Sequence, residues 1–96
     1  MAGCAYIDSV STGHGSWPSR VTAEGSPNVL VNGKGVHRLG DNWPVHCNSL
    51  GECHAGSTNK ASATVLVNGK GAARIGDSIS CGGNIATGSG NVLVGD

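Results

Sequence analysis

The sequence contains no phenylalanine, and its only aromatic residues are Tyr6, Trp17 and Trp43. Aromatic side chains bury the largest apolar areas, so their scarcity in a chain of 96 residues predicts a thin hydrophobic core. The 17 glycines weaken it further, because a glycine inside a regular element costs roughly 0.5–1 kcal/mol relative to alanine. The fold therefore needs support beyond apolar burial, from a metal, from disulfides or from a partner.

Charged residues are few and balanced, since 6 Lys and Arg offset 6 Asp and Glu. No basic cluster is present, which argues against nucleic acid as a partner, because phosphate binding needs concentrated Lys and Arg. No apolar run reaches the length of a membrane span. Residues 1–8 lack the basic and apolar regions of a signal peptide, so any export is expected to use another route.

What the sequence does contain is a repeat. Val-Leu-Val-Asn-Gly-Lys-Gly occupies residues 29–35 and recurs at 65–71, at an offset of 36 residues (65 minus 29). The front half of a third copy lies at residues 91–94, and residues 5–10 resemble its back half with one glycine dropped. Self-similarity at a fixed period indicates repeated structural units. We infer three related units around a pseudo-three-fold axis, the third assembled from both ends of the chain.

Each full repeat centres on an Asn-Gly pair, the strongest short-range signal for a two-residue β-hairpin. Both central residues of a type I′ turn need positive φ, which asparagine and glycine tolerate. Counting outward from the turns pairs Val29 with Val36 and Val65 with Ala72. Residues 91–94 are expected to form a single closing strand.

No window places apolar residues at helical spacing, so helices are expected to be absent or limited to one short turn. The predicted fold class is all-β, a single domain over residues 1–96 built of short β-hairpins with internal pseudo-three-fold repeats and long loops. Two segments, residues 11–27 and 43–60, are predicted to be irregular. Irregular segments of this length in a small domain are usually functional or held by something.

A metal-capable side chain follows the aspartate of each unit at a similar distance. The pairs are Asp8 with His14, six residues on; Asp41 with His46, five on; and Asp77 with Cys81, four on. A pseudo-three-fold arrangement brings equivalent positions together on its axis. His54 adds a fourth ligand, and three imidazoles with one thiolate form a tetrahedral set that favours zinc. Structural zinc contributes on the order of 10–16 kcal/mol to the folding of small peptides, which is enough to offset a thin core.

Other cysteine chemistry stays open from the residues alone. Cys47 and Cys53 stand beside two of the expected ligands, and they can either form a disulfide or replace a histidine. Cys4 is interpreted as an ordinary buried small residue. His37 is interpreted as a non-ligand, because its repeat counterpart is Ala73 and it lies off the positions that follow the aspartates. The aspartates themselves are expected to be structural, with each carboxylate accepting backbone N–H groups of a turn.

The sequence lacks the frames of known zinc hydrolases and deaminases. The Asn-Gly-Lys-Gly segments lack the spacing of a phosphate-binding loop, and the Ser-x-x-Lys at residues 57–60 lacks its companion motifs. The chain is therefore not expected to be an enzyme. Two alternatives from other classes are a small zinc-dependent hydrolase, with three ligands and a water, and a disulfide-stabilised extracellular binding module.

Several motifs, in order and at suitable spacing, resemble the PAAR-repeat proteins over almost the whole chain. They are Thr12-Gly13-His14, the histidine-rich loop, the repeat ending Ala-Ala-Arg-Ile-Gly-Asp at residues 72–77, Cys81-Gly82-Gly83, and Gly-Ser-Gly-Asn-Val at 88–92. The resemblance implies a small cone with zinc near its apex, bound by His14, His46, His54 and Cys81. The likeness departs at the Pro-Ala-Ala-Arg motif of the family, where this chain has glycine at Gly35 and Gly71 in place of proline.

The resemblance also implies a function. PAAR-repeat proteins cap the trimeric β-helical spike of type VI secretion systems and contractile phage tails, one copy per spike, and form the tip that pierces an envelope. The implied partners are the trimeric spike protein, effector proteins and, transiently, the target membrane. The implied location is the virion tail tip or secretion by a type VI apparatus, after assembly in the bacterial cytoplasm.

Overall fold

The computed structural model describes all 96 residues and contains eight short strands and no helix. None of its elements is therefore a membrane-spanning helix. The strands are β1 (Ala2–Gly3), β2 (Leu30–Val31), β3 (Lys34–Gly35), β4 (Asn42–Cys47), β5 (Cys53–Ser57), β6 (Leu66–Val67), β7 (Lys70–Gly71) and β8 (Leu93–Val94). They form four two-stranded antiparallel sheets, which pair β1 with β8, β2 with β3, β4 with β5 and β6 with β7. The all-β prediction is confirmed.

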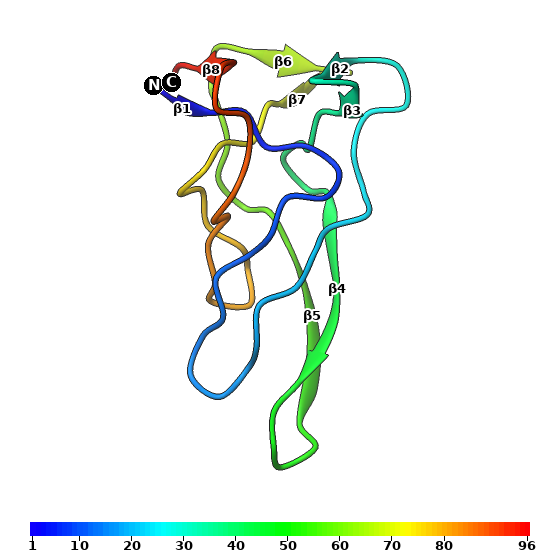
Figure 1. Ribbon diagram of the computed structural model, residues 1–96, viewed down its shortest axis with the longest axis vertical. Helices are drawn as coiled ribbons and strands as arrows, with labels where there is room; N and C mark the ends of the chain where they lie inside the picture. Colours follow the sequence, from blue (N-terminus) through cyan, green and yellow to red (C-terminus); the bar gives the residue numbers. More distant parts are fainter.

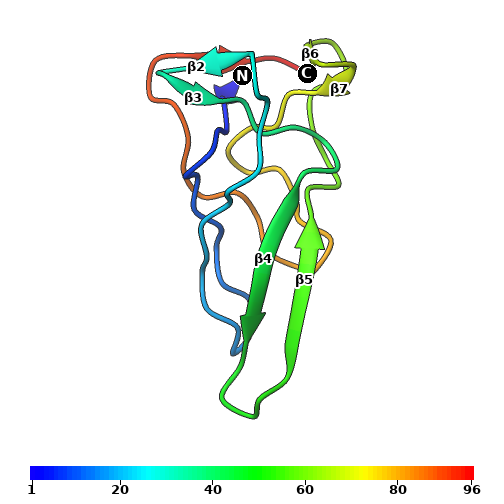
Figure 2. The ribbon, with the colours of Figure 1, turned by 90° about the vertical axis from the view of Figure 1, so that its right-hand side faces the viewer.

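The molecule is wide at one end and narrow at the other, as Figures 1 and 2 show. The six shortest strands gather at the wide end together with both termini, whereas β4 and β5 run toward the narrow end. The principal extents are 39 × 23 × 21 Å. We call the wide end the base and the narrow end the tip. The structure has the cone shape that the family resemblance implied.

The two Asn-Gly hairpins form at the base as predicted. Asn32 and Asn68 have φ of 54° and 55°, and each is followed by a glycine that also has positive φ. In the first hairpin the Val36 N–H donates to the Val29 carbonyl at 3.0 Å, and the second hairpin repeats this bond between Ala72 and Val65 at 2.9 Å. The predicted register is therefore confirmed.

A third hairpin equivalent joins the two ends of the chain. Gly3 of β1 pairs with Leu93 of β8, just as Gly35 pairs with Leu30 in the first unit. The unit inferred from both ends of the sequence thus exists, without a connecting turn. Its back half has no dropped glycine, because Asp8 (φ 86°) takes the place that Gly40 (φ 86°) has in the first unit.

The expected equivalence of Asp8 with the other two aspartates was wrong. The Ser9 hydroxyl accepts the Tyr6 N–H at 3.0 Å, the bond that the Asp41 carboxylate makes with the Arg38 N–H at 2.9 Å. Asp8 is exposed and lies 3.6 Å from the ammonium of Lys34. Aspartate tolerates the left-handed conformation that glycine usually fills, which hid the true alignment. For Asp41, and for Asp77 in the next unit, the structural role is confirmed.

The three units meet in a closed ring of backbone hydrogen bonds on the axis. The Ala5 N–H donates to Ala73, the Ala73 N–H to His37 and the His37 N–H to Ala5, at 2.9–3.0 Å. All three residues are fully buried. On the base side of this ring lies an apolar layer of Cys4, Val36, Val67, Ala72 and Val94; on the tip side lie Trp43, Ile79 and Ile85. The core is as thin as the composition predicts, with few large side chains in it.

His37 breaks the symmetry of the ring, where the other units have alanine. Its Nδ1 lies 2.7 Å from the Glu24 carbonyl, which can only accept, so this nitrogen carries the proton. Its Nε2 therefore accepts from the Thr58 hydroxyl at 2.7 Å. Burial lowers the pKa of His37 and keeps the imidazole neutral. His37 lies outside the metal-capable cluster, as expected.

Three loops leave the base toward the tip, one from each unit; we call them arms and number them in chain order. They run from Ser9 to Thr22, from Asp41 to Thr58 and from Asp77 to Ile85, and at the root of each arm the N–H of the last residue donates to the carbonyl of the first at 2.9–3.0 Å. The second arm is the β4–β5 hairpin, so the prediction of an irregular segment over residues 43–60 was wrong for most of it. Pro44 and a register shift between Trp43 and His46 break the alternation by which such a strand is recognised.

Candidate metal centre

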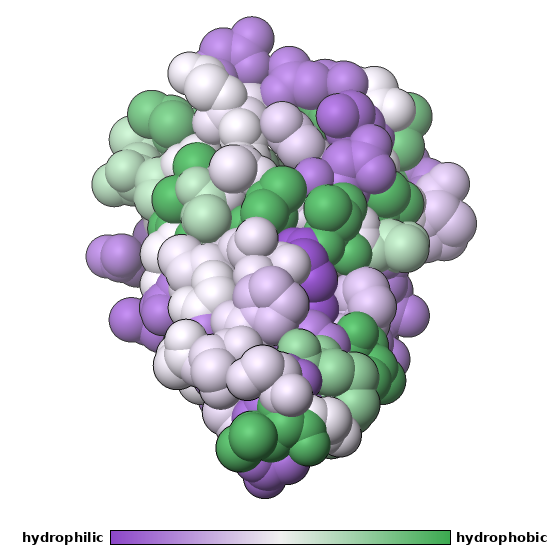
Figure 3. Space-filling view, turned by 60° about the horizontal axis from the view of Figure 1, so that its bottom comes forward, coloured by the Kyte–Doolittle hydropathy of each residue, from purple (hydrophilic) through white to green (hydrophobic).

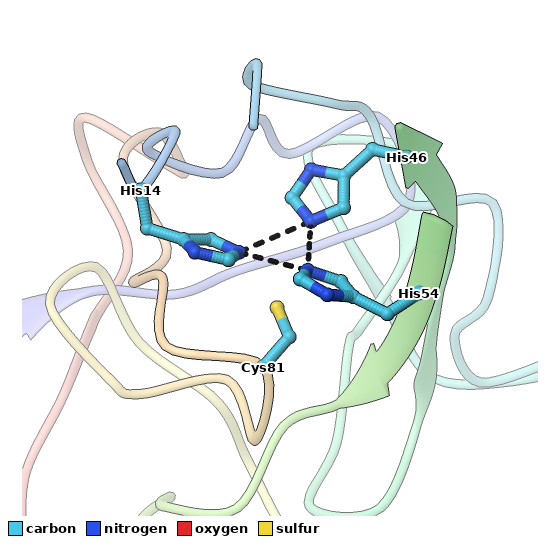
Figure 4. Close-up of side chains that lie close together, drawn as sticks. All are labelled: His14, His46, His54 and Cys81. Carbon is cyan, nitrogen blue, oxygen red and sulfur yellow. Dashed lines mark hydrogen bonds between the residues drawn. The ribbon is translucent and has the colours of Figure 1, made fainter. Parts of the chain in front are cut away.

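Four side chains converge near the tip: His14, His46, His54 and Cys81 (Figure 4). Their ligand atoms all lie within 4.8 Å of one another. They are the four residues that the sequence predicted as ligands, and we call them the tetrad. The structure thus brings every predicted site residue together.

Each arm supplies the tetrad from a defined local structure. His46 and His54 are cross-strand neighbours on β4 and β5 of the second arm. His14 lies in a tight turn of the first arm that is closed by paired backbone bonds with Trp17 at 2.9–3.0 Å. Cys81 lies in the turn of the third arm, next to Gly82, whose φ of 116° few other residues adopt.

The corrected alignment of the units makes the ligand positions more regular than the sequence suggested. Counted from Ser9 rather than from Asp8, His14 follows by five residues, as His46 follows Asp41. Only the third arm differs, with Cys81 four residues after Asp77. Two arms of different overall length therefore place their histidines the same number of residues from their roots.

The three Nε2 atoms form a close triangle. The His14–His46, His46–His54 and His14–His54 pairs are 3.1, 2.7 and 3.1 Å apart. The Nδ1 of His46 donates to the Pro18 carbonyl at 2.8 Å, which leaves a lone pair on its Nε2. The pKa values of His14 and His54 are lowered, first by desolvation and then by neighbouring imidazoles and Arg20. Neutral imidazoles with lone pairs toward one centre are what a metal ion requires.

The donor set fits a tetrahedral ion. A metal with bonds of about 2.0 Å to nitrogen holds its nitrogens roughly 3.3 Å apart, close to the observed triangle. Cys81 is a free cysteine and is only partly buried. Cys47 and Cys53, the next pair along the β4–β5 hairpin, form a disulfide, so neither competes for the ion. Cys4 is free and buried in the base layer, as interpreted from the sequence.

Two residues beside the tetrad carried no role in the sequence prediction. Trp17 stacks on His54 and His14, with ring centroids 4.7 and 5.3 Å apart, and its indole N–H donates to the Glu52 carbonyl at 3.0 Å. Arg20 donates to the Cys81 sulfur at 3.3 Å. One signal in the sequence was available: Arg20 is the only arginine outside the repeated motif.

The two glycines that stand where the family motif has proline lie at points of close backbone approach. Gly35 and Gly71 open the motif, and a Cβ at either one would lie 2.2–2.3 Å from the carbonyl of Ser26 or Ser62. The two strands therefore pass very close to the preceding segment of their own unit. In this chain the approach is accommodated by glycine.

Comparison with known proteins agrees with the geometry. No curated protein matches the chain at a significant level. The family model of the PAAR motif matches residues 12–87, which include the whole tetrad and leave out residues 1–11 and 88–96. That family is structural rather than enzymatic, and its members form spike tips of secretion or phage systems. The chain therefore belongs to the PAAR family.

Proposed function

We propose that the protein caps the end of a trimeric β-helical spike, one copy per spike, and sharpens it for piercing an envelope. The observation that carries this proposal is the three-fold apolar surface of the base. Leu30, Leu66 and Leu93 occupy equivalent positions in the three units and are 59%, 61% and 54% exposed. A monomer with pseudo-three-fold symmetry can present the same surface to each chain of a true trimer.

The base also presents backbone for pairing. Strands β2, β6 and β8 lie across the wide end, and each has a partner on one side only (Figure 1). Such an edge accepts a further strand by β-augmentation, and a spike end that covers it removes a route to aggregation. The leucines would then contact apolar side chains of the spike between the added strands.

At the tip, the tetrad is proposed to hold a structural zinc ion. Three imidazoles and one thiolate complete a tetrahedral shell and leave no position for an activated water, the feature that separates structural from catalytic zinc. His46 and His54 are attached to the second arm, His14 to the first and Cys81 to the third. The ion thus cross-links all three arms where the apolar core has ended.

The narrow end itself suits brief contact with a membrane. Figure 3 shows apolar atoms at this end of the molecule, and the exposed apolar side chains of the β4–β5 hairpin are Val45 (61%) and Leu50 (81%). The hairpin is closed by the Cys47–Cys53 disulfide. Disulfides persist in oxidising surroundings, so this one fits a tip that is delivered outside the cytoplasm. We propose that the protein is assembled in the bacterial cytoplasm and delivered by a phage tail or a type VI apparatus. Effector proteins are proposed as further partners.

Co-purification with the C-terminal end of a trimeric spike tests the capping proposal. The wild type is expected to bind with one copy per trimer, measured by the mass of the complex. Replacing Leu30, Leu66 and Leu93 together by aspartate should abolish binding, whereas Leu50→Asp at the tip should not. Retention of binding by the triple variant, or a stoichiometry of three, would contradict the proposal.

A further inference from the structure

Arg20 is a buried cation without a carboxylate partner. It is 9% exposed, and no Asp or Glu of the chain forms an ion pair with it. Its Nε is buried and has no hydrogen-bond partner. Arg38 and Arg74, by contrast, each bind an aspartate through two nitrogens. A guanidinium remains charged in proteins, so its burial requires an anionic or strongly accepting neighbour.

The neighbour that the structure offers is the sulfur of Cys81. Nη2 of Arg20 lies 3.3 Å from Sγ, and the guanidinium carbon lies 5.9 Å from the ring centroid of buried Trp43. The guanidinium thus has the aromatic core on one side and the tetrad on the other. It therefore contacts both Trp43 of the last apolar layer and Cys81 of the tetrad, and Cys81 itself also packs against that layer.

Pseudo-symmetry shows that Arg20 is an exception among the equivalent positions of the three units. The backbone of Arg20 pairs with Ser11, as Gly56 pairs with Trp43 in the second arm and Gly83 with Ile79 in the third. The other two units therefore have glycine where the first has arginine. A Cβ at Gly83 would lie 2.8 Å from the Thr12 carbonyl and one at Gly56 would lie 3.1 Å from Cys81 Cβ, so the packing of the arms leaves little room for a side chain at either position.

We propose that Arg20 is a positioning residue of the metal centre, whose N–H···S hydrogen bond orients Cys81 and reduces the reactivity of its metal-bound thiolate. The inference rests on the proposed metal centre. Cys81 is only partly buried, so a sulfur without this donor would be open to alkylation and oxidation. A hydrogen bond to sulfur draws electron density away from it, as outer contacts generally tune metal ligands.

Cobalt substitution of the zinc-loaded protein tests the inference. In a Cys4→Ala background Cys81 is the only free thiol. We expect Arg20→Met to retain one cobalt per chain, to shift the sulfur-to-cobalt charge-transfer band to longer wavelength, and to be alkylated by iodoacetamide several-fold faster. Arg20→Lys, which keeps one donor, should restore part of both changes. Lys70→Met, which removes an exposed charge at the base, should change neither.

Each result is decisive. An unchanged band and an unchanged alkylation rate in Arg20→Met would overturn the role of Arg20 while leaving the metal centre intact. Failure of the parent protein to form a thiolate-bound tetrahedral cobalt site would instead refute the proposed centre. If Arg20→Met does not fold, the wild type supplies the test by NMR. The chemical shifts of the side-chain N–H groups of Arg20, unlike those of Arg74, should change when cadmium replaces zinc. Signals that stay in place would contradict the hydrogen bond.

Discussion

The base and the tip are built by opposite means from the same three units. At the base the units repeat related sequences and a shared set of backbone hydrogen bonds, and each contacts the next around the axis. Arg38 donates to Asn68 in the turn of the second hairpin, Arg74 donates to the Gly95 carbonyl, and the Lys34 ammonium lies 4.9 Å from the ring centroid of Tyr6. Repetition is possible there because every unit meets an equivalent neighbour.

At the tip the three arms differ in length and content. Side chains from the three arms converge near the axis. A metal ion there needs only a few correctly placed ligands, so the three arms need not be identical. The first arm gives one ligand, the second two and the third one. The difference teaches that this cone is stabilised by many repeated polar bonds where it is wide and, under the proposed metal binding, by a few cross-links where it is narrow.

The largest expected effect comes from breaking the cross-link at the tip. Cys81→Ser should lose the metal and lower the free energy of unfolding by several kcal/mol, because metal binding contributes directly to folding of a domain with a thin core. His54→Ala should also lose the metal and unfold at lower temperature. Elemental analysis and thermal unfolding measure both.

The matched control for that variant lies at the base. Cys4 is buried, and its repeat counterpart is Ala72, so Cys4→Ala should keep the metal and most of the stability. Metal content that is unchanged in Cys81→Ser, or lost in Cys4→Ala, would contradict the expectation that the metal depends on the tip and not on the base.

The next effect breaks a repeated bond at the base. The Asp77 carboxylate is 5% exposed and accepts from the backbone and side chain of Arg74. Asp77→Ala leaves that guanidinium with the Gly95 carbonyl and, 3.9 Å away, the exposed Asp96 carboxylate as its only partners, and should cost about 3 kcal/mol. Asp8→Asn, at the exposed position that only looks equivalent, keeps a residue that tolerates a φ of 86° and should change stability by less than about 0.5 kcal/mol. Chemical denaturation of both variants measures the difference, and equal losses would contradict the corrected alignment.

A smaller effect is expected from the disulfide at the tip. Cys47 and Cys53 are six residues apart, so the loop that they close is short. Replacing both by serine should cost about 2 kcal/mol in the chain-entropy account and should leave the metal in place. Metal analysis of the double variant beside denaturant titration checks this. Loss of the metal would show that these cysteines support the centre directly.

The smallest effect concerns pH and the ring residue His37. Burial lowers its pKa below the ordinary 6.5, so the folded protein binds fewer protons than the unfolded chain. The stability that depends on neutral His37 is therefore present above about pH 6.5 and is lost as the pH falls below it. In zinc-loaded protein, unfolding free energy measured from about pH 7.5 down to about pH 5.5 should fall less steeply for His37→Ala than for the wild type. Parallel curves would contradict this role, since the metal contribution is common to both.

Much of the base could be predicted because its determinants are local. An Asn-Gly turn selects its hairpin without help from the rest of the chain, and the repeat fixed which residues correspond. The alignment failed only at Asp8, where an aspartate adopts a glycine conformation and the sequence offers no sign of it. The β4–β5 hairpin was missed because Pro44 and the register shift obscure its alternation.

The sequence by itself determined the class of fold, the three units and the four residues of the tetrad, because turn chemistry, period and ligand type are written in single residues and their spacing. Only the tertiary structure decided what surrounds those residues. The β4–β5 register decided that Cys47 and Cys53 form a disulfide rather than replace a histidine, and the stacking of Trp17 on His54 and the hydrogen bond from Arg20 to Cys81 join different arms. Such contacts depend on how the arms pack against one another, and no local pattern encodes them.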